Sequence, residues 1–182
     1  MRAPLVTIIL FVSYSTLVKS NCVVDTNKKF LDPTPLFIEA SLKKSFYNPT
    51  VQLSNLIFNT NDKFIIACPG PGNKIVNLNA QEAEVECDSS GKFAFKGKKY
   101  ELDNLKCKNW PTSVQDTTGV CGGSFKLVKT GFKVSGIFIP VMSTCFDDKT
   151  DRTLYTNITL SKNALFQTNI PRPSFRTGNF FK

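Results

Sequence analysis

The stretch that decides the fold class reads Lys92-Phe93-Ala94-Phe95-Lys96-Gly97-Lys98-Lys99-Tyr100. Successive side chains of a β-strand point to opposite faces, so Phe93 and Phe95 share one face and the lysines that flank them take the other. Gly97 readily adopts the backbone conformation of a tight turn, which returns the segment 99–102 alongside 92–96. The stretch therefore predicts an antiparallel hairpin with one apolar face.

Strand-like runs of the same kind recur along the chain. They lie at 51–58, 63–68, 83–87, 124–128, 132–139 and 154–160. Turn signals rich in Gly, Pro, Asn and Ser separate them, at 68–73, 89–91, 118–119, 121–123 and 130–131. One helical candidate, Ser161–Gln167, has a serine suited to cap its first turn. We therefore predict an α+β fold that is predominantly antiparallel β, with short helices.

The chain has 182 residues, a length typical of one domain, and its first 20 residues have the pattern of a secretory signal peptide. Arg2 precedes an apolar stretch at 5–12, and Val18-Lys19-Ser20 predicts cleavage before Asn21. The segment 21–50 shows little periodicity and is predicted to be a loosely structured leading segment tied down by Cys22. Residues 51–182 are predicted to form one strand-rich domain. No second apolar run is long enough to cross a membrane, so we predict a secreted, extracellular product.

Six cysteines follow the predicted cleavage site, an even number in an oxidising compartment. They are Cys22, Cys68, Cys87, Cys107, Cys121 and Cys145. Three disulfides without a free thiol are predicted, and the 15 ways of pairing six cysteines remain open. Because no CxxC spacing occurs, a zinc site is disfavoured. The sequon at Asn157 predicts N-glycosylation at the surface.

The chain is basic, with 23 Lys and Arg against 14 Asp and Glu and a net charge of +9, or +7 without residues 1–20. Lysines alternate with aromatic residues along the chain, Lys106 and Lys108 among them, and two sets are the candidate binding residues. The first set is Lys92, Lys96, Lys98 and Lys99, and the second is Lys126, Lys129 and Lys133. A basic strand face of this kind could bind the phosphates of a nucleic acid or another polyanion. The alternative is that the aromatic residues form the core while the lysines keep the outer face soluble.

The chain contains no histidine, which excludes a histidine general base, a Ser-His or Cys-His nucleophile pair and any histidine-containing metal site. Asp147, Asp148 and Asp151 form the densest acidic cluster, but their spacing differs from that of a calcium loop and favours a solvated hairpin loop. Cys121-Gly122-Gly123-Ser124 is interpreted as a turn beside a disulfide. No catalytic residue, metal ligand or cofactor site is therefore predicted in this chain.

Several short strings, taken in order, resemble the amino-terminal half of secreted arthropod proteins of the DNA/RNA non-specific endonuclease family, which includes salivary and double-stranded-RNA-degrading nucleases. The strings are Phe64-Ile65-Ile66-Ala67-Cys68-Pro69-Gly70, Val85-Glu86-Cys87, Leu105-Lys106-Cys107, Gly119-Val120-Cys121, the run 128–134, Cys145-Phe146-Asp147, Thr153-Leu154-Tyr155-Thr156 and the run 172–181. Together they extend over residues 62–182.

The resemblance implies a ββα-metal nuclease, in which an Arg-Gly-His motif supplies the general base and Mg²⁺ polarises the scissile phosphate. Arg176-Thr177-Gly178-Asn179 does not substitute for that motif, so no catalytic residue carries over. We therefore expect an incomplete nuclease fold and a non-catalytic amino-terminal part of such an enzyme, either a truncated product or a short secreted paralogue. The expected reading frame beyond Lys182 continues into an Arg-Gly-His segment.

The expected function is weak, sequence-independent binding of double-stranded RNA or DNA through the two lysine sets. The alternative is a secreted, salivary-type interaction protein whose basic face captures another polyanion, such as a sulfated glycan. Both alternatives use the same positive charges, so the residues alone do not separate them.

Overall fold

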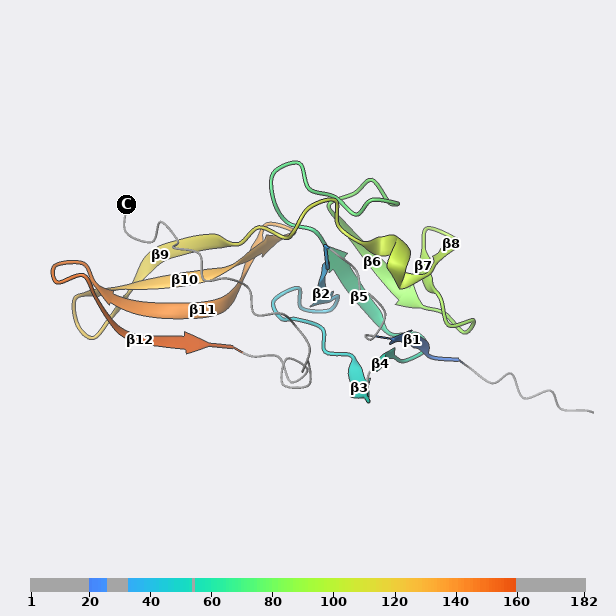
Figure 1. Ribbon diagram of the computed structural model, residues 1–182, viewed down its shortest axis with the longest axis horizontal. Coiled ribbons are helices and arrows are strands. Elements are labelled where there is room, and N and C mark those ends of the chain that lie inside the picture. Colours follow the sequence, from blue (N-terminus) through green and yellow to red (C-terminus); the bar gives the residue numbers. More distant parts are fainter. Residues whose placement is uncertain (1–19, 26–32, 54, 160–182) are drawn as a thin grey trace, which may run out of the picture.

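A computed structural model describes residues 20–25, 33–53 and 55–159. The predicted signal peptide, apart from Ser20, and the predicted helix Ser161–Gln167 lie outside these residues. Within them the chain forms twelve strands and one short 3₁₀ helix, η1, arranged in three antiparallel sheets (Figure 1). No helix in this part of the chain is long and apolar enough to span a bilayer.

The three-stranded and five-stranded sheets form a compact body, and the four-stranded sheet forms an elongated arm that extends from it (Figure 1). The body contains β1 (Cys22–Asp25), β2 (Leu36–Glu39), β3 (Thr50–Gln52), β4 (Asn55–Phe58), β5 (Lys63–Ala67), β6 (Glu82–Cys87), β7 (Phe93–Phe95), β8 (Lys98–Tyr100) and η1 (Leu102–Leu105). The strand orders are β1-β4-β3 and β2-β5-β6-β7-β8. The arm contains β9 (Val114–Cys121), β10 (Phe125–Val134), β11 (Ile137–Asp147) and β12 (Arg152–Ile158), in the order β12-β11-β10-β9.

The prediction of an α+β fold is wrong: the described part of the chain is nearly all antiparallel β. Its helical structure is limited to the single turn η1. Leu102 and Leu105 stand three residues apart in this turn and are both buried against the body core, so one 3₁₀ turn is enough to place them there. Buried residues alternate with more exposed ones in β1, β4 and β6, whereas β5 is buried continuously from Phe64 to Ala67, and both patterns are typical of strands.

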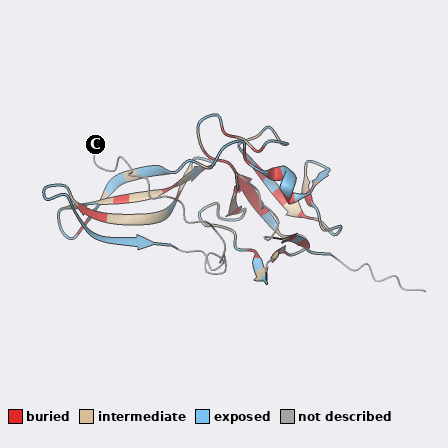
Figure 2. Cartoon of the chain, in the orientation of Figure 1, coloured by how far each residue is buried: buried red, intermediate tan, exposed pale blue. Residues whose placement is uncertain are grey.

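The hairpin predicted from residues 92–102 is confirmed. Phe95 pairs with Lys98, and the two residues between them, Lys96 and Gly97, both have positive φ, as a two-residue hairpin turn requires. Phe93 is buried, and its ring meets those of Phe58 and Phe64 edge-on at 5.2 and 5.8 Å between centroids. This aromatic cluster forms the centre of the body core, where the buried positions in Figure 2 concentrate.

The segment 21–50 contributes two strands to the sheets. β1 pairs with β4, with Cys22 and Val24 buried, and β2 pairs with β5, with Ile38 fully buried. Its periodicity is weak because each strand has only four residues. Long-range pairing therefore orders a segment in which local pattern predicted little structure.

The arm differs from its predicted strands at two turns. Gly131 lies inside β10 and Gly119 inside β9, although both were predicted as turn residues. The reversal occurs at Ser135 and Gly136, which both have positive φ and divide the predicted strand 132–139 between β10 and β11. The arm is a single layer with many exposed positions (Figure 2).

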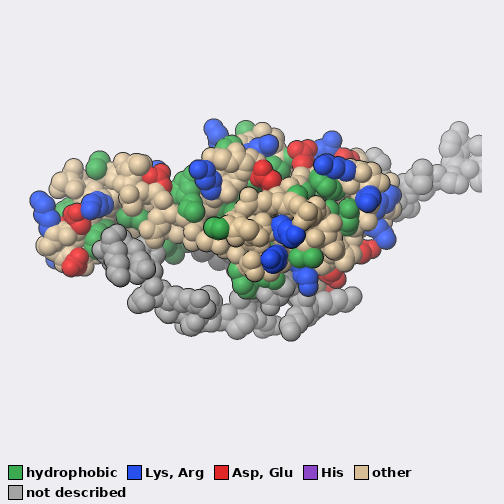
Figure 3. All heavy atoms as spheres, turned by 90° about the horizontal axis from the view of Figure 1, so that it is seen from above, with side chains coloured by type: hydrophobic (Ala, Val, Ile, Leu, Met, Phe, Trp, Pro, Cys, Tyr) green, Lys and Arg blue, Asp and Glu red, His purple; other side chains and the backbone are tan. Residues whose placement is uncertain are grey.

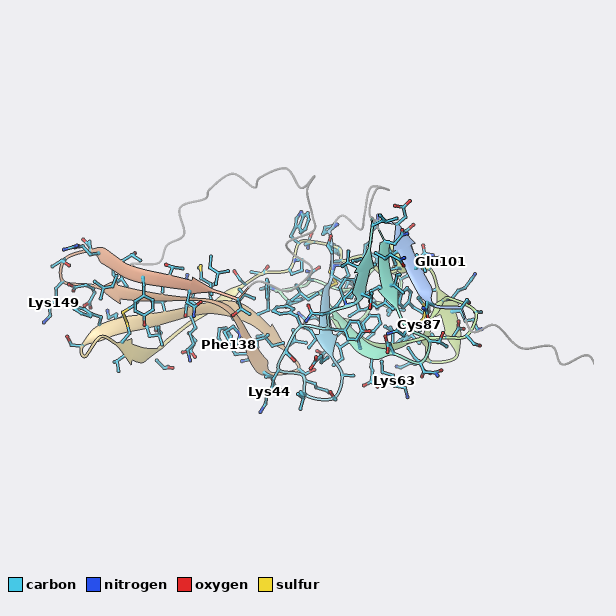
Figure 4. The ribbon with its side chains drawn as sticks, turned by 90° about the horizontal axis from the view of Figure 1, so that it is seen from below. Lys44, Lys63, Cys87, Glu101, Phe138 and Lys149 are labelled. Atoms are coloured by element: carbon cyan, nitrogen blue, oxygen red, sulfur yellow. A yellow bond between two sulfur atoms is a disulfide. The ribbon has the colours of Figure 1, made fainter. Side chains whose placement is uncertain are left out.

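The base of the arm is fixed to the five-stranded sheet of the body. Glu82 Oε2 accepts hydrogen bonds from the backbone N–H of Ser135, at 2.9 Å, and from its hydroxyl, at 2.8 Å. Beside this anchor, Val134 and Ile139 of the arm share a buried apolar cluster with body residues. The body members of that cluster are Ile38, Ile65 and Ala67. In Figure 4 the labelled Phe138 marks this junction.

The three predicted disulfides are confirmed, and all six cysteines, which lie in the described residues, are paired. Cys22–Cys87 and Cys68–Cys107 cross the body core, and Cys121–Cys145 joins β9 to β11 in the arm. The body core and the arm are therefore each cross-linked internally.

Candidate nucleic-acid interface

The first lysine set lies together on and beside the β7–β8 hairpin, and we call these four residues the hairpin lysines. Two are paired with carboxylates: Lys92 with Glu101 at 3.2 Å and Lys99 with Asp88 at 2.6 Å. The other two are Lys96, whose ammonium lies 5.3 Å from the centroid of the Phe95 ring, and Lys98. Neither forms an ion pair within the described part of the chain. Two of the four ammonium groups are therefore free to contact an external anion.

The second set lies along β10, and we call these three residues the arm lysines. Lys126 pairs with Asp148 at 2.7 Å and lowers the pKa of that carboxyl. Lys129 stands opposite Asp116, whose pKa is lowered by hydrogen bonds from Thr118 and by the charge of Lys129. Lys133, near the base of the arm, has no ion-pair partner in the residues that the structure describes.

The two sets do not form one continuous surface. The hairpin lysines lie at the end of the body away from the arm, whereas β10 runs along the arm (Figure 1). Figure 4 shows the same separation, with Glu101 at one end of the molecule and Lys149 at the tip of the arm. On the face seen in Figure 3, basic side chains are spread along the molecule with acidic ones among them. The sequence thus predicted each local set but not their separation.

The acidic cluster at the arm tip is a hydrogen-bonded loop. Asp147 accepts hydrogen bonds from the Lys149 backbone, at 3.0 Å, and from the Thr150 hydroxyl, at 2.7 Å, and these lower its pKa. Asp148 pairs with Lys126 instead. The described residues contain no group of three or more candidate metal ligands.

Asp88 organises the loop that leads into the hairpin. Its Oδ1 accepts hydrogen bonds from the Ser90 N–H, at 2.8 Å, the Ser90 hydroxyl, at 2.7 Å, and the Lys92 N–H, at 3.1 Å. Desolvation favours protonation of this carboxyl, but the interactions with Lys99, Ser90 and Lys92 outweigh it and hold the pKa well below its usual range.

We expect stability to depend on Asp88 in acid. Because its pKa is lower in the folded chain than the value near 3.8 of an unperturbed carboxyl, Asp88 stabilises the fold above about pH 4 and loses this effect as the pH falls further. Asp88→Asn should reduce the fall in thermal midpoint between pH 5 and pH 2, measured by circular dichroism. Asp103→Asn, which removes an exposed carboxylate from η1, is the control. An unchanged pH profile in Asp88→Asn would contradict this role.

A shallow hollow of about 460 Å³ lies on the body. Its lining residues are Glu39, Ala40, Ser41, Tyr47, Lys63 and Glu84. Tyr47 donates a hydrogen bond to Asp62, and burial together with that carboxylate raises the pKa of its phenol above the usual range. Tyr47 also stacks on Phe64 at 4.9 Å between ring centroids, so it acts as a part of the core.

Two further residues are exposed at the surface. Asn157, the predicted glycosylation site, is exposed on β12, and its modification stays a prediction. Trp110, the single tryptophan of the chain, is 62% exposed. Sequence reasoning missed Trp110, although its position shortly after Lys106 and Lys108 is a usable signal.

Comparison with known proteins gives one distant relationship. Over 123 residues the chain is 30% identical to a salivary endonuclease from Lutzomyia longipalpis. The aligned region covers 66% of this chain and 26% of that relative, so the chain spans about a quarter of the relative's length. No protein-family model matches the chain, and no solved structure matches it. The similarity therefore relates the chain distantly to an endonuclease.

Proposed function

We propose that the chain is a secreted, non-catalytic, endonuclease-related domain that binds nucleic acid without sequence preference. The observation that carries the proposal is the similarity to a salivary endonuclease in a chain whose net charge is +7 without residues 1–20. The three disulfides support an oxidising, extracellular setting. The absence of histidine, which excludes a histidine general base, supports a binding role for this chain rather than hydrolysis.

The binding mechanism that we infer is contact between free lysines and the phosphate backbone. Such contacts release condensed counterions and fall in strength with added salt. Among the residues that the structure describes, Lys96 and Lys98 have no ion-pair partner, whereas Lys92 and Lys99 are already paired with carboxylates. The free pair should therefore contribute more to affinity than the paired residues on the same hairpin.

We expect Lys96→Gln/Lys98→Gln to weaken binding more than Lys92→Gln/Lys99→Gln, although each variant removes two charges. Each lost phosphate contact reduces the slope of log K against log [salt] by about 0.9 for duplex DNA, so the first variant should lose about 1.8. Fluorescence anisotropy with a labelled 20-base-pair duplex of DNA or RNA, at several salt concentrations, gives both quantities. Equal losses in the two variants would contradict the assignment to free lysines.

Heparin tests the alternative of a sulfated-glycan partner. If duplex nucleic acid is the ligand, heparin should displace it only when the negative charges of heparin are in excess. The affinity for heparin should then fall with the same lysine substitutions. Tighter heparin binding at physiological salt would favour the glycan. No binding of nucleic acid even at low salt would overturn the proposed function.

A further inference from the structure

Trp110 occupies an unusual position for the largest apolar side chain of the molecule. The body core collects its phenylalanine rings from β4, β5 and β7, whereas Trp110 lies between η1 and β9 with 62% of its surface exposed. Tryptophan combines a wide apolar face with low conformational freedom, which is why it is enriched at binding interfaces. Its exposure next to a basic segment therefore indicates a binding surface.

The backbone around Trp110 is held firmly by the body. Asn73, the one buried polar side chain among the described residues, donates through Nδ2 to the carbonyls of Asn109, at 2.9 Å, and Trp110, at 3.5 Å. Its Oδ1 accepts from the N–H groups of Lys74 and Asn109, both at 2.9 Å. The Cys68–Cys107 disulfide anchors the same segment. The indole therefore stands on a rigid support, which lowers the entropy cost of binding.

The turn at residues 68–73, which contacts the segment around Trp110, has an equally constrained backbone. Gly70 has a φ of +132°, and a Cβ at this position would lie 2.7 Å from Thr112 Oγ1. The N–H of Thr112 also donates to the Pro69 carbonyl at 2.9 Å. The predicted turn 68–73 thus positions the backbone on both sides of Trp110.

Two cations precede the aromatic ring in sequence, four and two residues before it. Lys106 and Lys108 are exposed on either side of the buried Cys107, and neither has an ion-pair partner in the part of the chain that the structure describes. The Lys108 N–H donates to the Lys74 carbonyl at 2.8 Å, which fixes this stretch to the same turn. An exposed aromatic ring beside unpaired ammonium groups is the combination that binds single-stranded nucleic acid, by stacking of bases and contact with phosphates.

We propose that Trp110, with Lys106 and Lys108, forms a binding site for an unpaired nucleobase, in which the base stacks on the indole and the adjoining phosphates contact the two lysines. This inference rests on the proposed nucleic-acid binding and specifies the form of nucleic acid that the site accepts. Bases inside a duplex are stacked on one another, so the site selects single strands or extruded bases.

Trp110 is the single tryptophan of the chain, so tryptophan fluorescence reports on the proposed binding site alone. The probes are a 12-nucleotide oligothymidylate and an abasic 12-mer, which carry the same phosphates but differ in their bases. We expect the oligothymidylate to quench the fluorescence of Trp110 and to bind roughly 5- to 150-fold more tightly than the abasic oligomer, the factor that about 1–3 kcal/mol of stacking corresponds to.

Anisotropy with labelled oligomers extends the test to variants. Trp110→Ala should bind both oligomers equally, and Trp110→Phe should retain part of the preference. Tyr155→Ala, which removes another exposed aromatic residue from β12, is the matched control and should behave as the parent chain. Equal binding of both oligomers by the parent chain, without quenching, would overturn base stacking on Trp110 and leave phosphate binding intact. Failure to bind either oligomer at low salt would overturn the proposed function and this site with it.

Discussion

Replacing both Cys22 and Cys87 with alanine is expected to lower the free energy of unfolding by about 4 kcal/mol. The bridge closes a loop of 65 residues, and the chain-entropy relation gives about this stabilisation for a loop of that length. Cys22 begins β1, which pairs with β4 beneath the aromatic core, so β1 loses its covalent attachment as well. Thermal unfolding should show a fall of roughly 10 °C.

The matched control removes the Cys121–Cys145 bridge, whose loop has 24 residues and for which the same relation gives about 3 kcal/mol. This bridge lies in the arm, so hydrogen exchange should rise first in β9 and β11. In Cys22→Ala/Cys87→Ala it should rise first in β1 and β4. Identical exchange patterns in the two variants would contradict the separation of the body core from the arm.

The features that local pattern predicted well are those that depend on alternation alone. Phe93 and Phe95 indicated an apolar face, and Gly97 indicated the turn; both hold because neighbouring strands of a hairpin need no distant partner. β1 and β2 were missed because each has four residues and gains its order from strands more than 20 residues away. Their stability comes from long-range pairing, which alternation cannot reveal.

The turns predicted at Gly119 and Gly131 in the arm were wrong for a physical reason. A glycine in sequence indicates either a turn or a place where two backbones approach closely, and the residue type is the same in both cases. Gly136 serves the turn, whereas Gly131 and Gly119 serve close approach inside strands. Distinguishing these roles requires knowledge of the strand register.

The lysine sets show a similar limit. Sequence located every member, but which ammonium groups are free depends on carboxylates brought close by folding. Asp88 reaches Lys99 across the hairpin, and Asp148 reaches Lys126 from the loop after β11. Trp110 was missed because its significance lies in exposure, which a sequence does not display. The fold therefore decides which of the candidate lysines have a free ammonium group, whereas the sequence identifies the lysines themselves.

The close approach at Gly131 leads to the second large expected effect. Replacement with alanine would put a Cβ 2.1 Å from the carbonyl oxygen of Ile139 and 2.8 Å from Pro140 Cα. Both contacts are with backbone atoms of β11, at the point where the β10–β11 register shifts, so no side-chain rotation relieves them. We expect Gly131→Ala to cost about 3 kcal/mol or more and to increase hydrogen exchange along β10 and β11.

Gly119→Ala is the matched control for this substitution, since it also adds one methyl group inside an arm strand. The three atoms nearest to its Cβ would belong to the Leu127 side chain, with Cβ and Cδ2 both at 3.1 Å, so a displacement of a few tenths of an ångström is enough to relieve the contacts. We therefore expect a cost of about 1 kcal/mol or less, measured by denaturant unfolding beside Gly131→Ala. Because Ile139 also packs in the apolar cluster at the base of the arm, Gly131→Ala should in addition weaken the attachment of the arm to the body. Equal losses in the two variants would show that the backbone contact at Gly131 does not control the arm.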